Sequence, residues 1–151
     1  QELTLIYGEI CAVLNGRAIC RFAYVLRTFA EQTKIFNQKP KVTNAKAGQS
    51  YHNYGLAVDV VLLVDNDHNK THETASWDFA TDFDGDGKAD WAEIDAIFFF
   101  FCFVGLYNKR GKRWDLPHFQ KTFGYTWQQL LELHEAKKFI AGTTYVDIEV
   151  K

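Results

Sequence analysis

One short segment of the chain joins a turn to an apolar run: Ser50-Tyr51-His52-Asn53-Tyr54-Gly55-Leu56-Ala57-Val58-Asp59. The run continues to Val64 and is rich in valine, which is typical of a central β-strand. Gly55 would let the backbone bend just before that strand. The segment therefore predicts that His52, in the turn, and Asp59, in the strand, reach toward the same place.

A second histidine and a second aspartate follow much later, in Asp115-Leu116-Pro117-His118. Catalytic zinc usually binds three His, Asp or Glu side chains and leaves a fourth position for water. His52, Asp59 and His118 would supply these three ligands. Asp115 would lie beside the metal, where a carboxylate can take a proton from water and pass it to a leaving amine. Together the four residues predict a zinc hydrolase site with the chemistry of a peptidase.

The same residues resemble the signature of a known family, the zinc peptidases that cut bacterial cell-wall peptides. That signature is Ser-x-His-x-x-Gly-x-Ala-x-Asp, followed by an acid three residues before a second histidine. The family comprises D-alanyl-D-alanine carboxypeptidases and L-alanyl-D-glutamate endopeptidases, and the likeness runs from about Ala18 to Tyr125. Every motif position is matched, by Ser50, His52, Gly55, Ala57, Asp59, Asp115 and His118.

The form Asp-x-Pro-His-Phe and the upstream Arg27-Thr28-Phe29-Ala30-Glu31-Gln32 resemble the endopeptidase branch, which includes phage endolysins. This resemblance implies hydrolysis of the L-Ala to D-Glu bond of the peptidoglycan stem peptide. It also implies that Arg27 contacts a substrate carboxylate or carbonyl. Ser50 is expected on the same substrate side, where it would orient the ligand loop or make a supporting hydrogen bond.

Two other functions remain open. A carboxypeptidase that removes terminal D-alanine is the alternative enzyme, and a zinc-containing binding domain without activity is the alternative of another class. The intact Asp115 favours an enzyme, because a purely structural metal site has no use for a poised carboxylate. Residues 36–42 and 105–114 depart from the usual loops of the family, so substrate preference is the property that the resemblance determines least.

A second motif lies at residues 82–93: Asp82-Phe83-Asp84-Gly85-Asp86-Gly87-Lys88-Ala89-Asp90-Trp91-Ala92-Glu93. It fits the calcium-loop pattern D-x-D-x-D-G-x5-E, in which alternating carboxylates surround a hard cation. The predicted ligands are the carboxylates of Asp82, Asp84, Asp86 and Glu93 and the backbone carbonyl of Lys88. Residues 77–81 are short for an entering helix, so an isolated calcium loop is expected. A polar turn that caps the next helix is the alternative. Bound calcium would stabilise the fold or control activity.

The composition predicts one enzyme domain over residues 1–151, with the calcium loop as an insert. The chain has 151 residues, of which 47% are hydrophobic and 16% aromatic, enough for a core. A net charge of -2 gives no bulk attraction to nucleic acid or to an acidic membrane. The expected partners of this monomer are peptidoglycan stem peptides.

Two local groups of residues, one basic and one of cysteines, carry further expectations. The basic cluster Lys109, Arg110, Lys112 and Arg113 predicts a solvated loop, with an anion-binding patch as the alternative. The three cysteines, Cys11, Cys20 and Cys102, predict buried thiols, and a pair between the first two is possible only in an exported protein.

The expected place of action follows from the resemblance rather than from a targeting signal. Residues 1–14 lack the basic start and the unbroken apolar core of an export signal. The apolar run 94–106 is too short to span a bilayer and predicts a buried helix. The resemblance implies action on the cell wall, either from the periplasm or the outside, or after release of a phage-encoded enzyme at lysis.

The periodicity and the resemblance together predict an α+β fold. A small central, mainly antiparallel sheet flanked by helices is expected, and the resemblance implies the Hedgehog/DD-peptidase-like arrangement. Capping boxes at Thr28–Glu31 and Thr126–Gln129 predict two helix starts. Helices are expected over 3–14, from 29 onward, over 94–106 and over 126–138, and strands over 18–26, 57–64, 116–119 and 144–150.

Overall fold

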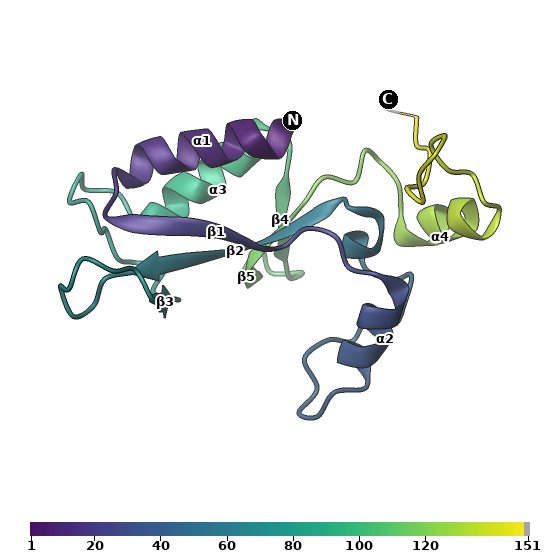
Figure 1. The fold of residues 1–151 in the computed structure, drawn as a ribbon, viewed down its shortest axis with the longest axis horizontal. Coiled ribbons are helices and arrows are strands. Elements are labelled where there is room, and N and C mark those ends of the chain that lie inside the picture. Colours follow the sequence, from purple (N-terminus) through teal and green to yellow (C-terminus); the bar gives the residue numbers. More distant parts are fainter. Residues whose placement is uncertain (150–151) are drawn as a thin grey trace. The chain divides into compact units, whose positions relative to one another are not determined.

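The computed structural model describes residues 1–149 (Figure 1). Within them, four α-helices accompany a mainly antiparallel five-stranded sheet, so the predicted α+β class is confirmed. In chain order the elements are α1 (Glu2–Leu14), β1 (Ala18–Tyr24), α2 (Phe29–Phe36), the 3-10 helix η1 (Tyr51–Tyr54), β2 (Ala57–Val64), β3 (Thr74–Ser76), α3 (Asp90–Phe100), β4 (Val104–Tyr107), β5 (Arg113–Gln120) and α4 (Trp127–Glu135).

The chain folds into two compact units. The first contains residues 1–23 and 59–119, and the second contains residues 24–58 and the chain from 120 onward. The sheet, α1 and α3 belong to the first unit, whereas α2, η1 and α4 belong to the second. That all 151 residues form a single domain stays a prediction.

The sheet of the first unit has the strand order β1-β2-β5-β4, and β3 pairs antiparallel with β2. Strand β2 covers the predicted range 57–64. Its side chains alternate in burial after Val58: Val60, Leu62 and Val64 are buried, whereas Asp59 is partly exposed. Because successive side chains of a strand point to opposite faces, Asp59 lies on the face opposite to these apolar residues.

Helices α1 and α3 pack together and lie on the same face of the sheet (Figure 1). Helix α1 buries Ile6, Ile10 and Leu14, the apolar stripe expected from the sequence. It ends where Asn15 adopts a left-handed conformation with φ 46°, and Gly16 follows with φ 73°. The helix therefore ends at Leu14, as predicted.

The prediction of one buried helix over residues 94–106 was wrong. Helix α3 begins earlier, at Asp90, and ends at Phe100, and residues 104–107 form β4. The backbone turns at Cys102, which has φ 62°. Phe99 and Phe100 are 74% and 80% exposed. A continuous apolar run has no periodicity that separates helix from strand, so the sequence could not reveal this division.

Helices α2 and α4 of the second unit begin in the two predicted capping boxes. The Glu31 carboxylate accepts a hydrogen bond from the Thr28 backbone N–H at 2.7 Å, and the Thr28 hydroxyl accepts one from the Glu31 N–H at 3.2 Å. Such reciprocal bonds satisfy amide groups that a helix start leaves free. Helix α4 ends at Glu135, three residues before the predicted end.

The predicted final strand over residues 144–150 was also wrong within the described part of the chain. There the backbone forms one isolated antiparallel bridge, between Phe139 and Val146, and Val150 lies outside the described residues. Val146 instead packs with Tyr54 and Leu130 in the core of the second unit.

The three cysteines are free thiols. Cys20 is buried as predicted, but Cys11 and Cys102 are exposed. Among residues 1–149, no helix has the length and apolar character needed to cross a membrane.

Candidate functional site

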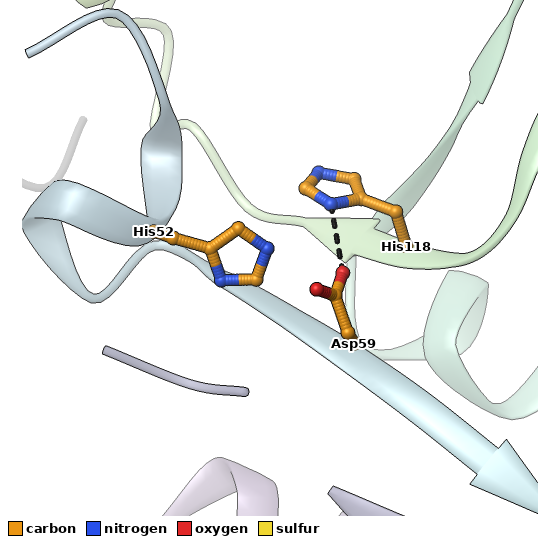
Figure 2. Close-up of side chains that lie close together, drawn as sticks. All are labelled: His52, Asp59 and His118. Atoms are coloured by element: carbon orange, nitrogen blue, oxygen red, sulfur yellow. Dashed lines mark hydrogen bonds and ion pairs between the residues drawn. The ribbon is translucent and has the colours of Figure 1, made fainter. Parts of the chain in front are cut away.

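Three side chains predicted as metal ligands lie close together (Figure 2). One ring nitrogen of His52, one carboxylate oxygen of Asp59 and one ring nitrogen of His118 all lie within 4.8 Å of one another. They come from η1, β2 and β5 respectively. Nδ1 of His118 lies 3.1 Å from Oδ1 of Asp59. The histidines are 2% and 7% exposed, whereas the aspartate is partly open to solvent.

This group fits a tetrahedral metal ion. Ligand atoms bound at about 2.0–2.1 Å to a tetrahedral zinc ion are about 3.4 Å apart, close to the separation of Asp59 and His118. Two imidazole nitrogens and one carboxylate oxygen leave a fourth position open, and the partly exposed carboxylate gives water access. The three residues could therefore hold a catalytic metal ion.

The backbone around His52 is held by several hydrogen bonds. Its carbonyl accepts from the Arg27 N–H at 2.9 Å and from the Gly55 N–H at 3.3 Å. Gly55 has φ 70°, so the predicted glycine bend is present. Ser50 precedes η1 and accepts the Asn53 N–H at 2.9 Å through its backbone carbonyl. These hydrogen bonds give the turn that carries His52 a defined position.

Asn53 contributes to this arrangement and was missed in the sequence. Its Oδ1 accepts from the Gly48 N–H at 2.9 Å, and its Nδ2 donates to the Arg27 carbonyl at 2.9 Å. The side chain thus ties the turn of His52 to two other segments of the second unit. The family signature allows any residue at position 53. The only sign in the sequence was that Asn53 directly follows the predicted ligand His52.

Arg27 lies between β1 and α2, at the predicted strand-to-helix corner. Its Nη1 donates to Oε1 of Gln32 at 3.2 Å, and its Cζ lies 4.9 Å from the centre of the Tyr24 ring. Gln32 is completely buried and donates to the Ala45 carbonyl at 2.7 Å. These contacts orient the guanidinium, and its contact with substrate stays a prediction.

Asp115 lies on β5, three residues before His118, and is partly buried. The basic cluster just before it is only in part the predicted solvated loop. Lys109, Arg110 and Lys112 are exposed, but the Arg113 side chain is only 10% exposed. The prediction was wrong for Arg113 because the residues packed around it come from α3 and β4, which local sequence does not reveal.

The loop at residues 82–93 has the backbone shape expected of a calcium loop. Oxygen atoms of Asp82, Asp84 and Asp86 lie within 4.8 Å of one another. The carboxylate of Asp82 accepts N–H groups of Gly85, Asp86 and Gly87, at 2.6, 3.2 and 2.8 Å. Gly87 has φ 92°, a left-handed conformation that favours glycine at the sharp turn. The loop thus gathers three carboxylates around one point.

Two further carboxylates lie at the end of this loop. Asp90, missed in the sequence although it continues the alternating pattern, is completely buried; its Oδ2 accepts the Phe83 N–H at 2.6 Å. Among residues 1–149, its Oδ1 and the Oε2 of Glu93 are buried without a hydrogen-bond partner. Burial raises the pKa of both groups, and the neighbouring aspartates raise them further. A cation would relieve this cost.

The comparison with known proteins identifies one curated relative. A segment of 76 residues, 47% of this chain, is 40% identical to the peptidoglycan L-alanyl-D-glutamate endopeptidase CwlK of Bacillus subtilis (strain 168). The match covers 42% of that relative, so the chain spans less than half of its length. No family model matches the chain. Over this segment, the chain is therefore similar to a cell-wall peptidase.

Proposed function

We propose that this protein is a zinc-dependent peptidase that hydrolyses the L-Ala to D-Glu bond of the peptidoglycan stem peptide. The observation that carries the proposal is the proximity of His52, Asp59 and His118, which are distant in sequence. The 40% identity to a relative named as an L-alanyl-D-glutamate endopeptidase supports the substrate and the bond.

Zinc is the metal that this donor set favours. Catalytic zinc commonly has three protein ligands of the His, Asp or Glu type. The backbone bonds to the His52 carbonyl would keep its ring in place, and the strand would do so for Asp59. When bound, zinc would polarise the scissile carbonyl and make water nucleophilic near neutral pH.

The protein's own residues would handle the proton and the substrate charge. The carboxylate of Asp115 would take a proton from the attacking water and deliver it to the departing amine nitrogen of D-Glu as the C–N bond breaks. The guanidinium of Arg27, oriented by Gln32 and Tyr24, would balance negative charge on a substrate oxygen. Ser50 would support the turn that carries His52.

Defined stem peptides test this proposal. The zinc-loaded protein is incubated with each peptide, and the products are identified by mass spectrometry. Release of the N-terminal L-Ala would support the endopeptidase. Loss of only a terminal D-Ala would favour the carboxypeptidase, and intact peptides in the presence of bound zinc would favour a binding domain.

The role of Asp115 has its own test. Asp115→Ala should reduce turnover below detection while zinc remains bound, because this carboxylate is proposed to move the proton without holding the metal. Asp147→Ala, at an exposed aspartate in the second unit, is the matched control and should retain turnover. Turnover by Asp115→Ala would remove the residue from the proposed role.

We also propose that the loop at residues 82–93 binds calcium. The expected ligands are carboxylate oxygens of Asp82, Asp84, Asp86 and Glu93 and the carbonyl of Lys88, now joined by Asp90. The buried, unpartnered oxygens of Asp90 and Glu93 support this, because a hard cation with oxygen ligands would satisfy them. Titration calorimetry should detect one calcium ion per chain, and Asp84→Ala should weaken binding.

The place of action follows from the proposed substrate. We propose that the protein acts on the cell wall, as an exported or a phage-encoded enzyme, and that it works as a monomer on stem peptides. Analytical ultracentrifugation of the zinc-loaded protein tests the monomer, and release of soluble fragments from purified cell walls tests the natural substrate.

A further inference from the structure

Arg113, the first residue of β5, is buried within the first unit. Its Nη1 forms an ion pair with Asp95 of α3. Its Cζ lies 4.3 Å from the centre of the Phe119 ring. A Cβ atom at Gly105 of β4 would lie only 2.7 Å from its Nε, so the guanidinium lies directly against the backbone of β4. The side chain therefore joins three elements of this unit.

The same guanidinium holds the segment that carries Asp115 and His118. Its Nη2 donates to the Leu116 carbonyl at 2.6 Å and to the His118 carbonyl at 3.3 Å. These carbonyls flank Pro117, which has no backbone N–H to contribute to the sheet. Arg113 thus donates two hydrogen bonds to the backbone on either side of a residue that cannot donate one itself.

This support reaches His118 through the backbone. Successive side chains of a strand point to opposite faces. Phe119 packs against Phe98 of α3 and the Arg113 guanidinium, whereas His118, the residue before it, contacts Asp59. Burial lowers the pKa of the Arg113 guanidinium, and the negative charge of Asp115 opposes this shift in part. The hydrogen bonds from Arg113 therefore act on the backbone from which the His118 ring projects.

We propose that Arg113 is a positioning residue, which with Asp95 holds the backbone of residues 116–118 so that the His118 ring faces Asp59. The functional meaning of this role rests on the proposed zinc peptidase. Lysine could not replace the arginine, because one ammonium group lacks the planar fork that reaches an acid and two carbonyls at once.

The test compares Arg113→Lys with Arg110→Lys, a control at an exposed arginine of the preceding loop. Supporting interactions of this kind typically change metal affinity or activity by about 10–100-fold when removed. Arg113→Lys should therefore weaken zinc binding or lower kcat by about that factor with KM little changed. Arg110→Lys should alter neither.

A readout without metal separates this inference from the proposed function. In the metal-free protein, the NMR signals of the His118 ring should shift in Arg113→Lys and not in Arg110→Lys. If the parent protein cleaves no stem peptide, the proposed function fails, but the His118 signals and zinc affinity still test Arg113. Unchanged signals together with zinc affinity and kcat within about two-fold of the parent would overturn the inference.

A second variant covers the case in which Arg113→Lys does not fold. Asp95→Asn leaves the arginine in place and removes the charge of its partner, whose side chain is 35% exposed. It should shift the same His118 signals and weaken zinc binding in the same direction. Where both variants fold, their effects in a double-mutant cycle should be less than additive, because both act through one contact. Unshifted His118 signals in a folded Asp95→Asn, or full additivity, would count against the role.

Discussion

Asp90→Asn should stabilise the metal-free protein and lose this advantage when calcium is bound. The substitution keeps the size of a completely buried side chain and removes its charge. The amide oxygen can still accept the Phe83 N–H, which now bonds Oδ2 at 2.6 Å. What disappears is a negative charge near Asp82 and Asp84, whose charges raise the pKa of Asp90 beyond the effect of burial.

The direction of the stability change in the metal-free protein follows from the raised pKa of Asp90. A carboxyl group with a raised pKa contributes stability below its ordinary value of 3.8, and this contribution is lost as the pH rises through the folded-state pKa. At pH 7 the charged Asp90 therefore destabilises the metal-free fold. Since a buried unsatisfied polar group costs about 1–3 kcal/mol and asparagine still buries an amide, the gain should be about 1 kcal/mol. For a chain of this length, that raises Tm by about 2–4 °C.

The stability advantage of the variant disappears when calcium is present. At a calcium concentration of about 100 times Kd, binding stabilises the parent by about 2.7 kcal/mol. If the loss of one carboxylate weakens binding about ten-fold, the same concentration stabilises the variant by only about 1.4 kcal/mol. The rise in Tm on adding calcium should therefore be about half as large in Asp90→Asn as in the parent.

Thermal unfolding at pH 7, in a calcium chelator and then in calcium, measures both effects. Asp147→Asn, at an exposed aspartate of the second unit, is the control and should match the parent in both conditions. The reasoning is refuted if Asp90→Asn lowers Tm in the chelator, or if it keeps the full increase on adding calcium.

Three other substitutions, the first with a matched control, test the core, the metal centre and the loop. Phe98→Ala should cost about 3–5 kcal/mol in urea unfolding, because the ring is completely buried and stacked at 3.9 Å on Phe119; Phe99→Ala, at a 74% exposed ring, should cost less than about 0.5 kcal/mol. His118→Ala should lose bound zinc in metal analysis, and retention of one ion per chain would exclude it as a ligand. Glu93→Gln should raise Tm of the metal-free protein at pH 7 and lose this advantage toward pH 4.5, because the raised pKa of Glu93 leaves it protonated there.

Local sequence predicted much of the fold and the centre of the site. The range of β2 and the two capping boxes were confirmed, because strand propensity and helix capping depend on residues within a few positions of each other. The proximity of His52, Asp59 and His118 was also expected, because a shared motif carries their spacing.

Only the tertiary structure revealed which charged groups are buried. Arg113 belongs to a basic cluster whose other members are exposed, and Asp90 belongs to an acidic loop that could equally be a solvated turn. The division of the phenylalanine-rich run at Cys102 was hidden in the same way. The sequence by itself determined the range of β2, the two capped helix starts and the residue types of the site. Burial depends on what packs against a side chain from distant segments, and short-range sequence patterns contain no such information.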